Sequence, residues 1–249
     1  MGCATTKVEE KLSPRVSSDG NSGQGKTATS SADAIRVAFL NGQLKADSRC
    51  PIDARQLYCL VKSWKAINRN MSVTAINTFV RLFETNHDIQ QMFSSFKDVK
   101  SIADLRNSKV LEGHAMKVFC TIDDTIVNFD DMDYVLKMLE MVAQSHSQRF
   151  PNFDPGFFWR VEEPFILAVK EELGDRFTVS IERTYRSTIR FIVGTLAREF
   201  VNSRQAAAAA TNGQAQVQTD RQAATASNGQ AKPQADPQSG VQKEKMNGV

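Results

Sequence analysis

Two of the three histidines occupy positions from which an imidazole could bind a metal ion. His114 follows Leu111 by three residues and precedes Val118 by four, a spacing that places all three on one helix face. His146 follows Val142 by four residues, at the end of a second apolar stripe. A histidine on such a face is more often a core residue than a ligand, so spacing alone leaves both interpretations open.

The helices that carry these histidines have clear start signals. Ser108 is a predicted N-cap for the helix that contains His114. The acidic run DDMD, residues 130 to 133, stands at the start of the helix that contains His146, where negative charge suits the helix dipole. The run lacks the glycine and the twelve-residue ligand pattern of a calcium-binding EF-hand. We therefore interpret it as a helix cap.

Two further helices are predicted before these. Asp53 caps a helix over residues 54 to 70. The next helix starts at Asn70 or Ser72, and its predicted inward residues are Val73, Ile76, Phe79, Val80 and Phe83.

Two more helices are predicted after His146. Asp154 and the proline that follows it start a helix that Gly174 ends, with a kink expected at Pro164. A long final helix should end near Ser203. The pattern as a whole is all-α.

Several segments resemble the landmarks of globins, in the correct order. The segment Gln144-Ser145-His146 resembles the end of globin helix F, which carries the proximal haem ligand. The segment from His114 to Val118 resembles the part of helix E with the distal histidine. The separation of the two histidines resembles that of neuroglobin-like members.

Upstream landmarks extend the resemblance to about residues 52 to 200. Phe93 stands where globins keep the phenylalanine that stacks on haem, and Phe79 resembles a residue of the distal pocket. Trp64 resembles the tryptophan of helix A. One departure is His87, which stands where many globins have the proline that starts helix C. Because that proline mainly fixes the local turn, its loss does not weaken the assignment of the haem site.

The resemblance implies an all-α globin fold with helices A to H around a haem b pocket. It implies that His146 binds the iron as the proximal ligand and that His114 is the distal residue, bound to iron or to its ligand. The implied cofactor contacts are Phe79, Phe93, Lys117, Val118, Val142 and Ser145. No catalytic residue is assigned.

The implied function is reversible binding of O2, NO or CO by a six-coordinate, bis-histidyl haem. The role expected of such a haem is redox signalling, oxygen sensing or electron transfer at a membrane. The expected partner is a cellular reductant or reductase. An oxygen carrier or storage globin, an NO dioxygenase or nitrite reductase, and a haem-free helical adaptor are the alternatives.

The ends of the chain differ in composition from its middle. We predict a disordered arm over residues 1 to 50, a globin domain over 51 to 203, and an Ala- and Gln-rich disordered tail over 204 to 249. Residues 34 to 40 have the composition of a short extra helical turn. Gly2 fits the pattern for myristoylation, and Cys3 beside it is a candidate for palmitoylation. Two acyl chains anchor a protein stably, which predicts attachment to the cytoplasmic side of a membrane.

Charge, cysteine spacing and hydropathy argue against nucleic-acid binding, CxxC-type sites and membrane-spanning segments. The net charge of +3 is shared between the ends and a near-neutral middle, so no nucleic-acid partner is expected. The four cysteines show no CxxC spacing, and a bridge between Cys50 and Cys59 stays open as an alternative to free thiols. No segment is apolar enough to be predicted to span a bilayer.

Overall fold

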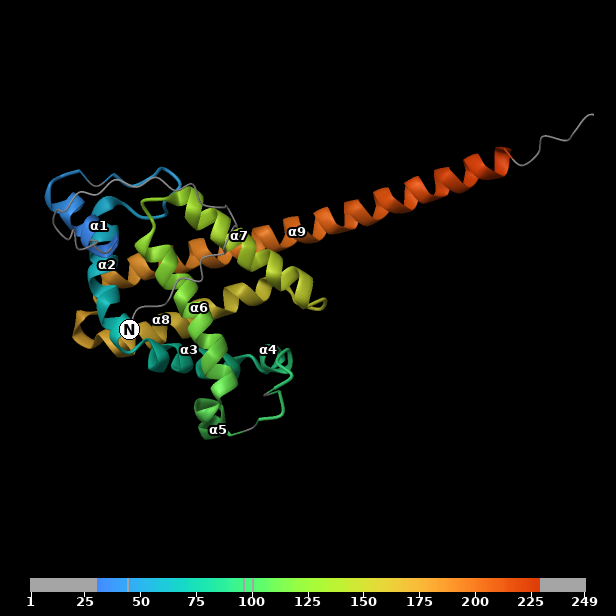
Figure 1. Cartoon of the computed structure of the whole chain (residues 1–249). Helices are drawn as coiled ribbons and strands as arrows, with labels where there is room; N and C mark the ends of the chain where they lie inside the picture. Colours follow the sequence, from blue (N-terminus) through green and yellow to red (C-terminus); the bar gives the residue numbers. More distant parts are fainter. Residues whose placement is uncertain (1–30, 44, 96, 100, 229–249) are drawn as a thin grey trace, which may run out of the picture. The chain divides into compact units, whose positions relative to one another are not determined.

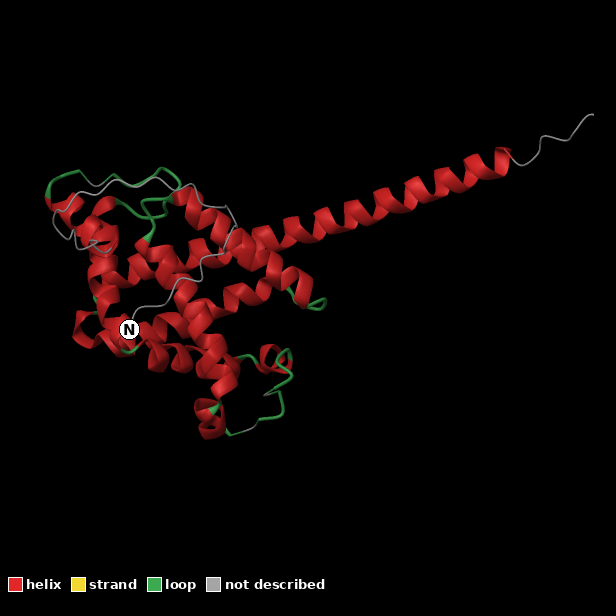
Figure 2. Cartoon of the chain, viewed as in Figure 1, coloured by secondary structure: helices red, strands yellow, loops and turns green. Residues whose placement is uncertain are grey.

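The computed structural model describes residues 31–43, 45–95, 97–99 and 101–228. Every regular element in these residues is a helix, as the all-α prediction requires (Figures 1 and 2). The elements are α1 (Ser31–Leu40), α2 (Ala54–Arg69), α3 (Met71–Thr85), α4 (His87–Gln91), α5 (Ile102–Asn107), α6 (Lys109–Val127), α7 (Met132–Arg149), η1 (Pro155–Val161), α8 (Glu162–Leu173), η2 (Gly174–Arg176) and α9 (Val179–Asn228). None of the helices within the described ranges is both long and apolar enough to cross a bilayer.

Residue contacts divide the chain into two compact units, Met1–Arg204 and Gln205–Val249. In the first unit α3 packs between α6 and α8, and α2 contacts both of these helices. The predicted domain limits at residues 51 and 203 stay predictions. Gly2 and Cys3 lie outside the described residues.

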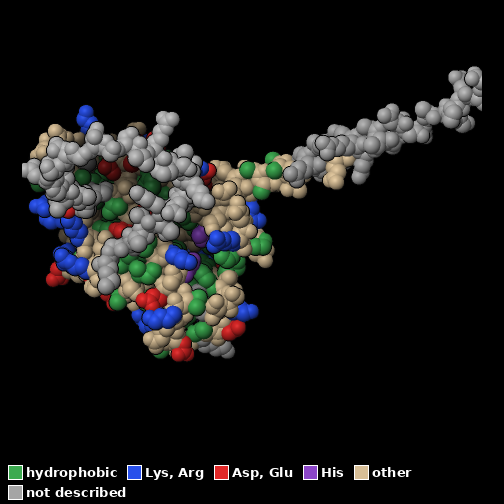
Figure 3. Space-filling view, in the orientation of Figure 1, with side chains coloured by type: hydrophobic (Ala, Val, Ile, Leu, Met, Phe, Trp, Pro, Cys, Tyr) green, Lys and Arg blue, Asp and Glu red, His purple; other side chains and the backbone are tan. Residues whose placement is uncertain are grey.

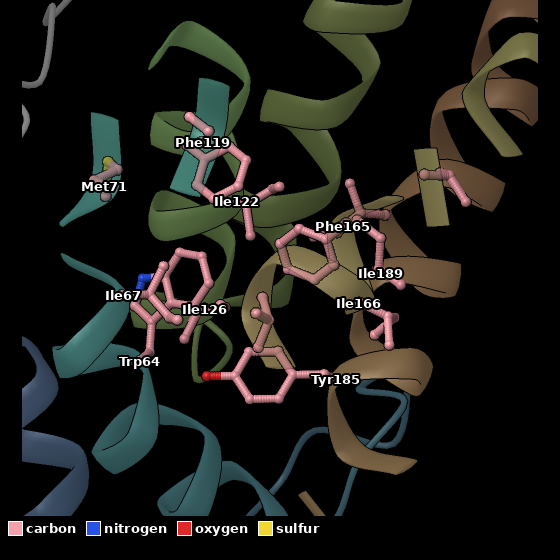
Figure 4. Packing of buried hydrophobic residues seen from close by; sticks show 14 of the residues in the cluster. Trp64, Ile67, Met71, Phe119, Ile122, Ile126, Phe165, Ile166, Tyr185 and Ile189 are labelled. Atoms are coloured by element: carbon pink, nitrogen blue, oxygen red, sulfur yellow. The ribbon is translucent and has the colours of Figure 1, made fainter. Parts of the chain in front are cut away.

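An aromatic cluster forms the centre of the core of the first unit (Figure 4). The Trp64 ring lies 6.2 Å from the rings of Phe119 and Tyr185 and 6.4 Å from that of Phe165, measured between centroids. These residues come from α2, α6, α8 and α9, so one cluster ties four helices together. Such ring contacts stabilise a core beyond the apolar area that they bury.

The polar edge of this tryptophan is also satisfied. Trp64 Nε1 donates a hydrogen bond to Asp123 Oδ1 at 2.7 Å, and the Asn68 amide donates to the same oxygen at 3.0 Å. Trp64 is 1% exposed, so its N–H has no access to bulk water. The hydrogen bond therefore links α2 to α6 and fixes the orientation of the indole.

Most predicted helix starts are confirmed. Asp53 caps α2 with a full capping box, Ser108 caps α6, and Asp131 caps α7. These side chains accept hydrogen bonds from backbone N–H groups that have no partner within the helix. The Cys50 and Cys59 thiols are both free, so the alternative of a bridge between them is wrong.

Four expectations differ from the structure. Residues 31 to 40 form the ten-residue helix α1, in which Ile35 is buried and Phe39 stacks on Tyr58 at 4.4 Å. Val73 is 58% exposed, because it lies on the solvent side of α3. Pro164 causes no mid-helix kink, since a 3-10 segment precedes α8 and places this proline in the first turn of α8.

The fourth difference concerns the last helix. α9 does not end near Ser203 but continues to Asn228. Five consecutive alanines, residues 206 to 210, follow the expected end, and alanine has the highest intrinsic helix propensity. Low sequence complexity therefore did not mean the absence of helix here.

The hydrogen bond between Trp64 and Asp123 should contribute measurably to the free energy of unfolding. Asp123→Ala removes the acceptor and leaves the buried indole N–H unpaired, which should lower the free energy of unfolding by about 1–3 kcal/mol. Asp130→Ala, at an exposed position, is the matched control and should change it little. Urea unfolding compares the two variants, and equal stability would contradict a role for this hydrogen bond.

Candidate functional site

A single apolar pocket brings the two histidines of the apolar stripes together. It lies between α3, α6, α7, the segment from 150 to 161, and α9, and is partly open to solvent. Six of the predicted site residues line it: Phe79, Phe93, His114, Val118, Val142 and His146. His87 lies outside this pocket, in a different and more polar hollow.

Lys117 and Ser145 do not line the pocket. Lys117 is exposed on α6, and its charge acts on the ring of His114. Ser145 is half-buried on α7. Their predicted contacts with a cofactor stay predictions.

His146 is held by the helix that carries it. Its Nδ1 lies 2.8 Å from the carbonyl oxygen of Val142, one turn earlier in α7. A carbonyl oxygen can only accept, so Nδ1 carries the proton and Nε2 keeps a free lone pair. This is the hydrogen bond expected of a metal-binding histidine, because it sets both the tautomer and the ring orientation.

Phenylalanines surround His146. The centroids of the Phe158, Phe153 and Phe150 rings lie 5.3, 5.6 and 5.9 Å from that of the imidazole. Burial lowers the pKa of His146, the hydrogen bond to Val142 acts in the opposite direction, and the charge of Arg149 lowers the pKa further. The ring is therefore neutral at pH 7.

His114 lies against a separate group of aromatic rings. Its imidazole meets the rings of Phe93 and Phe79 edge-on, with centroids 5.0 and 5.2 Å away. Burial lowers the pKa of His114 to about 4, with further lowering from the neighbouring His146 imidazole and from the charge of Lys117. His114 is thus also neutral at pH 7, and a neutral imidazole offers a lone pair to a metal.

Residues of α9 support the end of α7. Ser147 Oγ donates to the Gln144 carbonyl at 2.9 Å, so the Ser203 hydroxyl, 2.7 Å away, donates to Ser147. Arg204 Nη2 donates to the carbonyl oxygens of Phe150 and Pro151 at 2.8 and 2.9 Å. The chain directly after His146 is therefore held by two side chains from α9.

Sequence reasoning missed this supporting group. The four phenylalanines of FPNFDPGFF, residues 150 to 158, all line the pocket, and Arg204 and Ser203 hold the end of α7. The density of phenylalanine directly after His146 was an available signal. The contacts of Ser203 and Arg204 were not foreseeable, because they join residues more than 50 positions apart.

These residues fit the haem that the resemblance implies. Most side chains that line the pocket are apolar, which suits a flat, apolar macrocycle. His146 offers Nε2 as a nitrogen ligand with its other nitrogen already hydrogen-bonded. Histidine side chains are visible at the surface of the first unit, beside apolar and basic side chains (Figure 3).

Globins are among the known proteins that this chain resembles. The family model described as "Globin" matches residues 76–196. The globin of Bursatella leachii is 32% identical over 114 residues, which cover 42% of this chain and 77% of that protein. The neuroglobin of Tetraodon nigroviridis is 23% identical over 55% of this chain and 84% of its own length.

A solved structure extends the comparison to three dimensions. The crystal structure of a hexacoordinated heme protein from an anhydrobiotic tardigrade, at pH 4, matches with a TM-score of 0.59 and 29% identity. The match covers 62% of this chain and 99% of the tardigrade chain. On the evidence of its sequence relatives, its helical fold and its paired histidines, the chain belongs to the globin family.

Proposed function

We propose that this globin binds haem b between α6 and α7, with His146 as the proximal ligand and His114 as the distal ligand. The observation that carries the proposal is the hydrogen bond from His146 Nδ1 to Val142, which leaves Nε2 free in the pocket that His114 also lines. The sequence has no CxxCH motif for covalent attachment, which favours non-covalent haem b.

Bound haem would supply an iron centre that takes up diatomic gases reversibly and exchanges single electrons. The protein contributes ligands, orientation and exclusion of water. His146 presents one nitrogen in a fixed tautomer, since Nδ1 donates its proton to Val142. The rings of Phe150, Phe153 and Phe158 keep water away from this imidazole.

His114, on α6, would control access to the iron of a bound haem. Its ring is neutral and flanked by Phe79 and Phe93, so it can act as a second nitrogen ligand. A six-coordinate state is supported by the similarity to a tardigrade protein described as hexacoordinated. O2, NO or CO would then compete with His114 for one position.

Six-coordination favours a role other than bulk oxygen storage, because the distal position is already filled. We propose redox signalling, oxygen sensing or electron transfer, with a cellular reductant or reductase as partner. Attachment to the cytoplasmic side of a membrane through acyl chains at Gly2 and Cys3 is part of this proposal. Its support is the MGCATT sequence at the start of the chain.

The ligand assignment predicts distinct absorption spectra. Ferrous wild-type protein should show low-spin bands, and His114→Leu should turn them high-spin because one of two nitrogen ligands is lost. His146→Ala should lose the cofactor, whereas His87→Ala, outside the pocket, should keep it. High-spin ferrous wild-type protein would refute the six-coordinate state.

The lowered pKa of His114 predicts how the stability of the haem-free protein depends on pH. The folded protein binds this proton only near pH 4, while the unfolded chain binds it near the ordinary pKa of 6.5. Stability contributed by His114 is therefore present above pH 6.5 and lost as the pH falls toward 4.

The size of this effect can be tested by substitution. Between pH 7 and pH 4.5, wild-type protein should lose about 2 kcal/mol more stability than His114→Leu, measured by urea unfolding. His87→Leu, at an exposed position, is the control and should retain the wild-type dependence. The same loss in wild-type and His114→Leu protein would show that His114 is not the group responsible.

Membrane attachment has its own test. Gly2→Ala prevents myristoylation and should move the protein from the membrane fraction to the soluble fraction of cells that express it. Cys3→Ser should weaken membrane attachment less than Gly2→Ala does, because the myristoyl chain at Gly2 would still bind the bilayer reversibly. An unchanged distribution of Gly2→Ala would rule out anchoring by this route.

A further inference from the structure

The charges of the first unit are unevenly distributed along the chain. Residues 31 to 70 contain seven basic and three acidic residues, whereas residues 71 to 204 contain 16 basic and 19 acidic residues. The near-neutral total therefore conceals a basic part with net charge +4 beside an acidic part with net charge −3. The expectation of a near-neutral middle overlooked this separation.

Most of the positive charge lies on one face of α2. Its four basic residues are Arg55, Lys62, Lys65 and Arg69, and the helix contains no acidic residue. At 100° per residue these four positions fall within a sector of about 80° around the helix axis. All four side chains are exposed. We call this row of four residues the basic stripe.

The basic stripe continues onto α1. Arg36 of α1 lines a hollow together with Lys62, Lys65 and the ring of Tyr58. Val37 and Leu40 of α1 are 52% and 63% exposed, so apolar side chains lie on the same helix as Arg36. Basic side chains gather along the left edge of Figure 3, where Figure 1 shows α2.

Little of this charge is neutralised by neighbouring side chains. Lys65 Nζ lies 3.3 Å from Asp33 Oδ1, but within the described ranges no carboxylate lies within 4.0 Å of Arg36, Arg55, Lys62 or Arg69. Arg186 of α9 differs, since it contacts Glu162, Glu163 and Glu182. The stripe thus has its charge available for a partner.

The place of the stripe argues against a partner that exchanges electrons with haem. None of the residues of α1 or α2 lines the pocket that holds His114 and His146. A reductase would dock where the pocket opens, whereas a bilayer needs only a face with exposed cations and some apolar side chains. Nucleic acid is less suited, because Val37 and Leu40 add nothing to phosphate binding.

We propose that the face formed by α1 and the basic stripe docks on anionic phospholipid headgroups. The proposal rests on the membrane attachment proposed above and adds an orientation to it. The 30 residues before α1 can span at most about 100 Å, so acyl chains at Gly2 and Cys3 alone would leave the domain free to turn. If α1 and α2 dock on the lipid, these two helices lie between the bilayer and the rest of the domain.

Unacylated full-length holoprotein separates this proposal from the acylation itself. Sedimentation would measure binding to vesicles of phosphatidylcholine alone and of phosphatidylcholine with phosphatidylserine. Binding should require phosphatidylserine and weaken as salt rises. The triple variant Arg55→Gln, Lys62→Gln, Arg69→Gln should bind on the order of 100-fold more weakly, given the usual contribution of each cation near an anionic surface.

The control is a triple variant with the same loss of charge at exposed positions elsewhere. Lys109→Gln, Lys137→Gln, Lys170→Gln changes α6, α7 and α8 and should bind as wild type does. Equally weak vesicle binding by both variants would show that only the net charge of the protein matters, and would overturn the proposal. Stripe-dependent binding to soluble polyglutamate without binding to vesicles would overturn it in favour of an acidic protein. An unchanged haem spectrum in both variants keeps either result separate from the ligand assignment.

Discussion

The hydrogen bond from His146 Nδ1 to the carbonyl of Val142 is the interaction on which the site depends. It spans one turn of α7, so the helix itself selects the tautomer of the imidazole. Without it, Nδ1 and Nε2 would compete for the proton, and the free lone pair would have no fixed direction. The pocket supplies the second requirement, because burial keeps both His146 and His114 neutral.

The surrounding fold keeps α7 and α6 at the two sides of this pocket. α3 packs between α6 and α8, and the cluster around Trp64 ties α2, α6, α8 and α9 together. On the α7 side, Ser203 and Arg204 of α9 bind the chain before and directly after the end of the helix. A rigid scaffold of this kind is what a metal site requires, since ligand positions must be held closely.

The parts of the fold that follow from local pattern were predictable, and those that depend on distant contacts were not. The helix caps at Asp53 and Ser108 can be predicted from residue type and position alone. The same holds for the spacing of apolar residues that directs His114 inward. Val73 fits the same pattern, but its side chain is 58% exposed. The continuation of α9 depended on helix propensity, which the low complexity of the tail obscured.

The site shows the same division. The spacing of residues located His114 and His146, and resemblance to globins named their roles and the positions of Phe79 and Phe93. Arg204 carries no local sign of its contact with the chain after His146, because the contact forms only when α9 folds back onto α7. The basic stripe was present in the sequence of α2, yet the net charge of the chain concealed it.

The most direct test of the paired histidine ligands is a crystal structure of the hemin-loaded protein. We predict electron density for one haem between α6 and α7, with the Nε2 atoms of both His146 and His114 at coordination distance from the iron. Iron bound through any other residue, or a haem located outside this pocket, would contradict the assignment.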